Sequence, residues 1–182
     1  MQEFLCNFDD FFFYIPNLAR DIRQENIEAC ILYAQRFQLA PKLGQAFYLD
    51  ILQNQLLPDY IELLNGGTFV NCDGNTQLFY GLKPAIIHLA FAEFSLKNQY
   101  KITDSGIVNK NFDFSEGVKK TERNEFAVDN QNIAGQYLTS VFEYLNENKD
   151  KFPLWKGCFK DVNNASPYII SHAIKQQQYP NQ

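Results

Sequence analysis

Histidine and cysteine are scarce in this chain of 182 residues, which contains two histidines and four cysteines. None of the cysteines forms the closely spaced pairs on which zinc and redox motifs depend; they are Cys6, Cys30, Cys72 and Cys158. His88 lies within an apolar segment and His172 near the C-terminus, so the sequence shows no convergent set of metal ligands. We expect no metal site, unpaired thiols and a hydrogen-bonded structural role for His88.

Motifs of catalysis and of nucleotide binding are also missing. The chain has no Gly-x-Ser-x-Gly elbow, and the run from Asn65 to Gly67 lacks the Lys-Ser or Lys-Thr pair that follows in a phosphate-binding loop. The acidic residues Asp113 and Glu116 do not have the spacing of a calcium-binding loop. We therefore expect a protein that is not an enzyme and binds no cofactor.

Positive charge is limited as well. The 16 lysines and arginines are outnumbered by 21 acidic residues, which gives a net charge of -5 and a pI near 5.0. Apart from Lys119 and Lys120 the basic residues are scattered, so no basic stripe is available for nucleic-acid phosphates. Acidic residues interrupt the apolar N-terminus, which is unlike a signal peptide, and we expect synthesis in the cytoplasm.

No apolar run is long enough to cross a membrane. The longest candidate, residues 82–97, would be about 24 Å long as a helix and is interrupted by His88 and Glu93. This segment has almost no polar face, which predicts a helix surrounded by protein, with Ile86 and Leu89 fully buried. We expect it to be the central helix of the core.

What the chain has in abundance is uncharged amide side chains: Asn and Gln together make up 33 of the 182 residues. Such side chains form hydrogen bonds without the desolvation cost of a charge, which suits a surface that is soluble before assembly and buried after it. The alternative explanation is a genome whose base composition favours A and T codons.

Hydrophobic periodicity predicts helices on either side of the central one. A first helix is expected over 21–38, a second over 41–55, and a short third over 59–64 that ends at Gly66. The longest helix is expected over 118–148. The apolar face of the first helix is predicted to consist of Ile27, Cys30, Ile31, Ala34 and Phe37. That of the second helix is predicted to consist of Phe47, Leu49, Ile51, Leu52 and Leu56. That of the longest helix is predicted to consist of Phe126, Ile133, Tyr137, Val141, Tyr144 and Leu145.

Two places favour β-structure. A two-residue turn at Asp73 and Gly74 between apolar segments predicts a hairpin over 68–80. Short strands are possible at Ile102 and at Ile107–Val108, on either side of Gly106, within a polar stretch that continues as a loop over 109–117. A long polar loop in a compact domain usually serves binding.

The two ends of the chain predict arms. Residues 4–16 carry six aromatic side chains, which favours an extended strap that docks on the core or on a neighbouring subunit. Residues 160–182 contain two prolines and a Gln-Gln-Gln run. The predicted fold is therefore mainly α: a four-to-five-helix core with a small β-hairpin and a protruding loop, and extended N- and C-terminal arms.

Three segments carry a resemblance to a known family: FYGLKPAIIHLAFAEF, ITDSGIVNKNFDFSE, and the end of the longest helix, YLNENKDKFPLW. Over about residues 20–157 the chain resembles the head-to-tail connector proteins (neck or adaptor rings) of tailed phages, of the Bacteroides-phage and crAss-like type. The resemblance implies a structural virion protein of the neck, made in the host cytoplasm. Such a protein binds the portal vertex as a homo-oligomeric ring with the portal's twelvefold symmetry, a dodecamer, and extends the DNA channel toward the tail.

The partners that this resemblance implies are other copies of the chain, the portal protein and downstream neck or tail proteins, with DNA only passing through and no membrane. The chain then divides into an N-terminal aromatic arm (1–16), a helical connector domain (17–159) and a C-terminal arm (160–182). A ring needs two different contact surfaces on each subunit. We expect them in the protruding loop and the C-terminal arm, at Lys101, Ile102, Ile107, Val108, Lys110, Phe112, Phe114, Tyr168, Ile169, Ile170 and Ile174.

The alternative interpretation is a non-viral helical protein-interaction module without enzymatic activity. Such a module would not form a ring, so the mass of the native assembly distinguishes the two.

Overall fold

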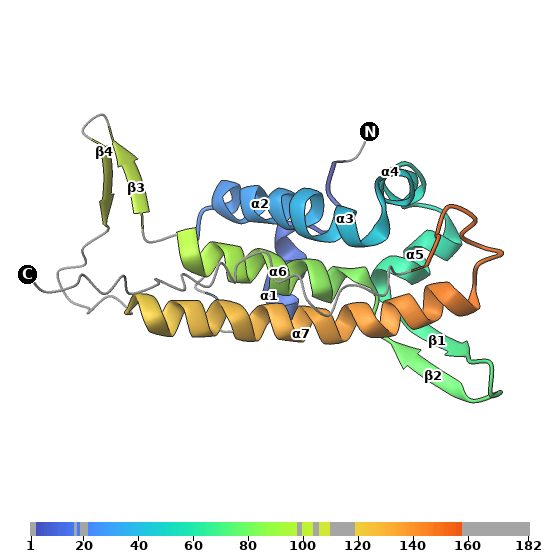
Figure 1. Ribbon diagram of the computed structural model, residues 1–182. Coiled ribbons are helices and arrows are strands. Elements are labelled where there is room, and N and C mark those ends of the chain that lie inside the picture. Colours follow the sequence, from blue (N-terminus) through green and yellow to red (C-terminus); the bar gives the residue numbers. More distant parts are fainter. Residues whose placement is uncertain are drawn as a thin grey trace, which may run out of the picture.

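A computed structural model of the chain describes residues 3–16, 18, 22–97, 100–103, 106–109 and 119–157, of which the two short segments between 100 and 109 are described by their backbone. The structure is mainly helical with small antiparallel hairpins, as predicted (Figure 1). The helices are α1 (Phe8–Tyr14), α2 (Gln24–Tyr33), the π-helical η1 (Ala34–Leu39), α3 (Ala40–Leu43), α4 (Gln45–Asn54), α5 (Pro58–Asn65), α6 (Leu82–Lys97) and α7 (Lys120–Glu147). The strands are β1 (Gly67–Val70), β2 (Thr76–Phe79), β3 (Tyr100–Thr103) and β4 (Gly106–Asn109).

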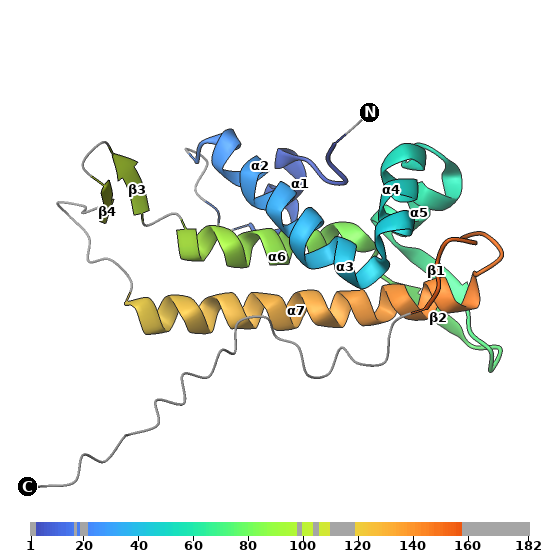
Figure 2. The same ribbon diagram turned by 45° about the horizontal axis from the view of Figure 1, so that its top comes forward.

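Helix α6 is the centre of the core. It lies between α7 on one side and α2 on the other in both views, and α1 also packs against it (Figures 1 and 2). Its predicted bounds are confirmed, and Ile86 and Leu89 are buried, with 0% and 5% of their surface exposed. The one acidic side chain buried on this helix, Glu93, forms an ion pair with Lys97 one turn later.

Helix α7 packs along α6, but its buried stripe differs from the prediction. Phe126 and Ile133 were expected inside and are 43% and 37% exposed. Smaller residues take their place in the first half of the helix, because they let the two helices approach closely. The buried positions follow a three–four spacing: Ala127, Asn130, Ala134, Leu138, Val141 and Leu145, with Tyr144 beside them.

The N-terminal segment is a helix and not the predicted extended strap. Asn7 caps α1 through a reciprocal pair of hydrogen bonds: Asn7 Oδ1 accepts from the backbone of Asp10, and the Asp10 carboxylate accepts from the backbone of Asn7. The aromatic periodicity then puts Phe11 inside the core, with no exposed surface, against Phe91 of α6. The predicted docking on the core is therefore observed, in helical form.

A π-turn changes the register of the first predicted helix. The backbone N–H of Ala40 donates to the carbonyl of Gln35, five residues earlier, so η1 holds one more residue in its turn than an α-helix would. As a result Phe37, predicted to be inside, is 67% exposed, and Gln35 is buried instead. The Gln35 amide is satisfied there because its Oε1 accepts from the backbone N–H of Leu5 at 2.8 Å and its Nε2 donates to the Glu3 carbonyl at 3.1 Å.

The second predicted helix is split at Gly44, whose φ of 83° ends α3. Pro41 lies within α3, which continues the helical run of α2 and η1 without a gap, so it does not mark the break. In α4 the burial of Phe47 and Ile51 is confirmed. Leu49 and Leu56 were wrongly expected to be inside. Leu49 is 42% exposed, because one face of a short helix holds only every third or fourth residue, and Leu56, 79% exposed, lies in the turn after α4.

Helix α5 and the first hairpin follow the prediction. Gly66, with φ of 92°, ends α5, and β1 and β2 then pair antiparallel from Gly67 opposite Phe79 to Val70 opposite Thr76. The connection between the strands is longer than the expected two residues. Asn71 Oδ1 organises it by accepting from the backbone N–H groups of Asp73 and Asn75, at 3.1 and 2.8 Å.

The turn after α7 returns to the core. Phe152 and Trp155 are buried against Phe47 of α4, with ring centroids 5.9 and 5.7 Å apart, and Trp155 Nε1 donates to Asn146 Oδ1 at 3.0 Å. Leu154, between them, is 42% exposed. The chain therefore passes back over the end of α7 before residue 158, where the described structure stops.

Candidate interaction site

The predicted contact residues fall into two groups. Four of them, Lys101, Ile102, Ile107 and Val108, belong to β3 and β4, which confirms the short strands expected around Gly106. The register pairs Lys101 with Val108 and Ile102 with Ile107. The others lie outside the described residues, as does most of the loop expected over 109–117: Lys110, Phe112, Phe114, Tyr168, Ile169, Ile170 and Ile174.

The β3–β4 hairpin projects from the body of the molecule. It follows the C-terminal end of α6, and in both views it lies beyond the last turn of that helix (Figures 1 and 2). Its two strands pair only with each other among the described strands. This end of the molecule is also the end at which α7 begins (Figure 1).

The β1–β2 hairpin lies at the other end of α7, and aromatic packing holds it there. Phe79 stacks on Tyr144 of α7 with ring centroids 3.9 Å apart and planes at 11°, and Phe69 meets the same ring edge-on at 5.7 Å. Tyr144 Oη donates to Glu62 Oε2 of α5 at 3.1 Å. The hairpin is therefore fixed in its orientation relative to the helices.

Two glycines allow the base of this hairpin to lie against the end of α5. A Cβ atom on Gly66 would lie 2.6 Å from the carbonyl oxygen of Phe79. One on Gly81, whose φ is 78°, would lie 2.5 Å from the backbone nitrogen of Gly66. No side chain fits at either position, so the backbone of the hairpin base touches the backbone of the helix end.

The opposite face of the β1–β2 hairpin is open to solvent and uncharged. Strand alternation places Thr68, Val70, Thr76 and Leu78 on it, and all four are exposed, Val70 at 61% and Leu78 at 56%. Tyr80, directly after β2, is 53% exposed. We call Thr68, Val70, Thr76 and Leu78 the outer face of the hairpin.

Sequence reasoning did not single out this exposed outer face, although it found the hairpin. The signal was present: Val70 and Leu78 alternate with the aromatic residues Phe69 and Phe79, so only one of the two sets can face the helices. Larger rings bury more surface, which decides in favour of Phe69 and Phe79. The smaller apolar residues are left outside.

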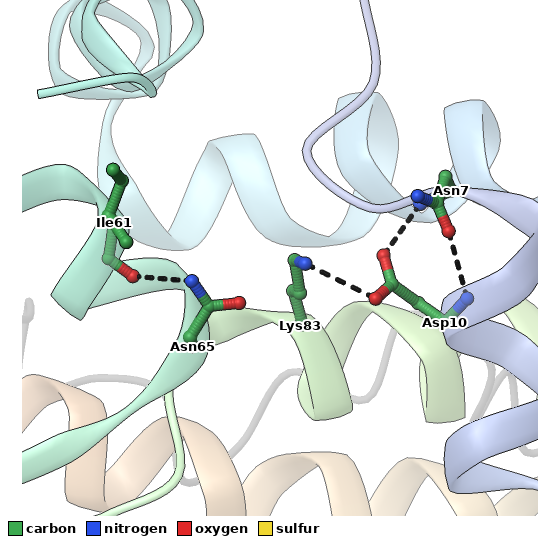
Figure 3. A network of polar contacts seen from close by, with 5 residues as sticks. All are labelled: Asn7, Asp10, Ile61, Asn65 and Lys83. Atoms are coloured by element: carbon green, nitrogen blue, oxygen red, sulfur yellow. Dashed lines mark hydrogen bonds and ion pairs between the residues drawn. The ribbon is translucent and has the colours of Figure 1, made fainter.

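A shallow cleft of about 180 Å³ lies between the N-terminal segment, α5 and the start of α6. Figure 3 shows its polar wall, in which the Lys83 ammonium is 3.2 Å from the Asp10 carboxylate that also caps α1. Asn65 donates to the carbonyl of Ile61 on the α5 side (Figure 3). Because Lys83 and Asp10 neutralise each other, this cleft presents no net charge to a ligand.

The thiols near the core are protonated at neutral pH. Burial, with a smaller effect of the Asp10 charge, raises the pKa of Cys6, and burial raises the pKa of Cys30 from 9.0 to about 11. A thiol rather than a thiolate is a poor nucleophile and a poor metal ligand. No three His, Cys, Asp or Glu side chains gather into a possible metal site within the described part of the chain.

His88 packs between α6 and α7 in the way expected of a structural histidine. Its Nδ1 lies 2.9 Å from Asn130 Oδ1, and its ring stacks on Tyr137 at 5.7 Å. The Asn130 Nδ2 donates to the carbonyl of Phe126 at 2.9 Å, so its Oδ1 is the acceptor and His88 Nδ1–H is the donor. His172 lies outside the described residues.

The helices that the structure describes include none that is both long and apolar enough to span a membrane.

Comparison with known proteins places the chain in a family. Residues 39–163, more than half of the chain, match a family model described as "Family of unknown function (DUF6712)". The chain belongs to the DUF6712 family. No curated protein and no solved structure matches it.

The DUF6712 match includes most of the elements described above. It begins at Leu39, the last residue of η1, and extends beyond Trp155, so that both hairpins, α6 and α7 lie within it. Helices α1 and α2 precede it. The two hairpins therefore belong to the family part of the chain, whereas the N-terminal wall of the cleft, formed by residues such as Asp10, does not.

Proposed function

We propose that this DUF6712 protein is a structural virion protein, a head-to-tail connector that binds the portal vertex of a tailed phage as a ring and extends the DNA channel toward the tail. The observation that carries the proposal is the pair of different hairpins at the two ends of α7 (Figure 1). A closed ring needs two different surfaces on each copy, because its contacts are heterologous. The molecule offers two such surfaces, far apart.

The charge of the long helix also supports the proposal. The solvent side of α7 carries exposed carboxylates at Glu122, Glu125, Asp129, Glu143 and Glu147. Exposed carboxylates of this kind repel phosphates and do not grip them, so α7 would not hold DNA that passes through the ring. The contact partners would then be other copies, the portal protein and the next neck or tail protein.

The test uses the purified full-length protein with the portal protein of the same virus. We expect the free subunit to be monomeric and a ring coaxial with the portal to appear in electron micrographs of the mixture, with a matching mass in native mass spectrometry. A protein that remains monomeric and does not bind the portal would contradict the connector proposal. That outcome would favour the alternative, a non-viral helical interaction module.

A further inference from the structure

The shallow cleft beside α5 combines an apolar rim with buried polar groups. Leu56 lines it and is, at 79%, the most exposed large apolar side chain among the described residues; Ile61, 44% exposed, lines it as well. The amide of Gln55, which is only 8% exposed, and the ion pair of Lys83 with Asp10 belong to the same lining. Concave sites that combine apolar side chains with a few placed polar groups are those that proteins use for binding. The hollow and its buried amide thus distinguish Leu56 and Ile61 from apolar side chains that are merely exposed.

The volume of the cleft, about 180 Å³, limits what can occupy it. Cofactors and drug-sized ligands usually fill pockets of about 300–1,000 Å³, so this cleft is too small for them. It carries no net charge, because Lys83 and Asp10 neutralise each other. The cleft therefore suits one or two uncharged side chains of a peptide segment.

The turn after α7 lies close to this cleft, on the other side of α5. Lys151 Nζ is 3.5 Å from Asp59 Oδ1 and 3.8 Å from Glu62 Oε2, so the turn is next to that face of the helix. Ile61 and Leu64, three residues apart on another face of α5, line the cleft. Lys151 and the cleft are therefore separated by about the width of one helix with its side chains, about 10–12 Å.

The chain beyond Gly157 is long enough to reach the cleft and has the composition to fill it. Eleven residue steps lead from Gly157 to Tyr168. When extended they span up to about 36 Å, roughly three times the width of a helix. Residues 162–174 contain no Lys, Arg, Asp or Glu and include Tyr168 and three isoleucines. A segment of this kind can enter a neutral cleft without the cost of desolvating a charge.

The family match divides the chain in a way that sets the same two parts aside. Its bounds, residues 39–163, exclude the N-terminal wall of the cleft and all of residues 164–182. The wall and the segment that follows the match thus lie together outside the family part of the chain, which a contact between them explains.

We propose that residues 168–174 occupy the cleft of the same copy, with isoleucine side chains against Leu56 and Ile61. The same copy is favoured over a neighbour, because a segment on a tether of about ten residues has an effective concentration in the millimolar range. The cleft is shallow, so the segment opens and closes on it and is no part of the core. This contact lies within one copy and does not depend on the proposed function.

Disulfide trapping in the full-length chain tests the cleft contact. In a background with Cys72→Ser and Cys158→Ser, one chain carries Leu56→Cys together with Ile170→Cys, and a second carries Leu56→Cys together with Ile169→Cys. After oxidation we expect an intramolecular disulfide in at least one of the two chains. It should form at least about tenfold faster than in the control below, at a rate independent of protein concentration. Peptide mass mapping identifies the linked positions.

The control replaces Leu56→Cys by Leu49→Cys. Leu49 is 42% exposed and belongs to α4, against which the turn after α7 packs, but it is not among the residues that line the cleft. Equal rates at positions 56 and 49 would overturn the proposal, because the segment would then meet both surfaces by chance. Rates that rise with protein concentration and yield covalent dimers would also overturn it, since the cleft would then hold the segment of another copy.

Thiol labelling provides a second measurement, in the full-length chain with its own cysteines. Cys6 and Cys30 are both buried, and of the two Cys6 lines the cleft. The triple variant Ile169→Ser, Ile170→Ser and Ile174→Ser removes the isoleucines that we place against the cleft. We expect it to speed the alkylation of Cys6 by at least about threefold and to leave that of Cys30 unchanged.

A matched triple variant, Gln176→Ser, Gln177→Ser and Gln178→Ser, lies in the same arm and should change neither rate. Equal labelling of Cys6 in the isoleucine variant and in the parent would refute the cleft contact. Faster labelling of both thiols would refute it too, because the isoleucines would then stabilise the whole core and not cover one cleft. These measurements need no portal protein, so failure of the cleft contact and failure of the connector proposal are distinguished.

Discussion

Single side chains of α6 carry a large share of the stability. Leu89 is 5% exposed and is surrounded by the packed layers on either side of its helix. We expect Leu89→Ala to lower the free energy of unfolding by about 2–5 kcal/mol, through lost burial and the cavity left behind. Urea unfolding followed by circular dichroism measures this, and a loss near zero would place the core elsewhere.

At His88, by contrast, we expect a substitution to have little effect on stability. In His88→Gln the new amide can still donate toward Asn130 Oδ1, so the variant should fold and assemble like the parent apart from a small packing loss. Asn130→Ala is the informative comparison, because it leaves the His88 Nδ1–H without its acceptor and should cost about 1–3 kcal/mol. Stoichiometric zinc in the parent protein that disappears in His88→Gln would contradict the structural role.

Buried phenols make the fold sensitive to alkaline pH. Burial, with the neighbouring Glu62 charge and hydrogen bond, raises the pKa of Tyr144, and burial with the bond to Asp50 raises the pKa of Tyr60. A folded state that holds its protons more strongly than the unfolded state keeps its full stability below the unfolded pKa, about 10, and loses stability as pH rises above it.

We therefore expect the urea concentration at which half of the protein is unfolded to decrease as the pH is raised from about 9.5 to 11. This decrease should be less steep in Tyr144→Phe, which has one titrating group fewer. Glu62→Gln should keep most of the pH dependence of this urea concentration, because burial is the larger cause of the raised pKa of Tyr144. An identical slope in the parent and in Tyr144→Phe would show that this phenol does not contribute.

At the level of elements, backbone contact decides how the first hairpin is fixed. Gly81→Ala would force a Cβ into the backbone at the end of α5, in addition to the strain of a positive φ. Gly44→Ala has the same sign of φ but open space around it, so it should cost only the strain, about 1–3 kcal/mol. We expect Gly81→Ala to be clearly more destabilising in thermal unfolding, and equal losses would refute the close contact.

The elements that the sequence predicted well are those whose hydrophobic pattern allows only one assignment of buried and exposed residues. Helix α6 is apolar on all sides, so any register buries it, and Gly66 marks the end of α5 before the first hairpin. The errors arose where two faces competed. Phe37 moved outside because a π-turn, which no propensity indicates, shifted the register by one residue, and Phe126 and Ile133 lost the inner face of α7 to Ala127 and Ala134.

The candidate site was predictable in part for the same reason. The β3 and β4 strands were visible as apolar residues around a glycine in a polar stretch, and so Lys101, Ile102, Ile107 and Val108 were found. The outer face of the first hairpin was not found, because its exposure depends on the position of Tyr144, which is distant in sequence. Competition between the two sides of a strand is settled by tertiary packing.

At the level of the whole molecule, the buried core of the described residues ends at Trp155. Every buried residue of the described core precedes Lys156, so a chain truncated after Gly157 should keep nearly the same thermal unfolding temperature. We expect the truncated chain to lose attachment to portal-bearing heads, because residues 160–182 are predicted to make contacts that order on binding. Loss of folding would place the arm in the core, and full attachment would place the contacts elsewhere.

The length of α7 also fixes the circumference of any closed assembly built through the hairpins. Rotational symmetry places both contact points of a copy at the same height and radius, so each copy contributes a chord about as long as α7, roughly 42 Å. Twelve such chords enclose a circle about 160 Å across, many times wider than a DNA duplex. Copy number and diameter are thus tied to each other, so the mass of the assembly and its width in micrographs must agree.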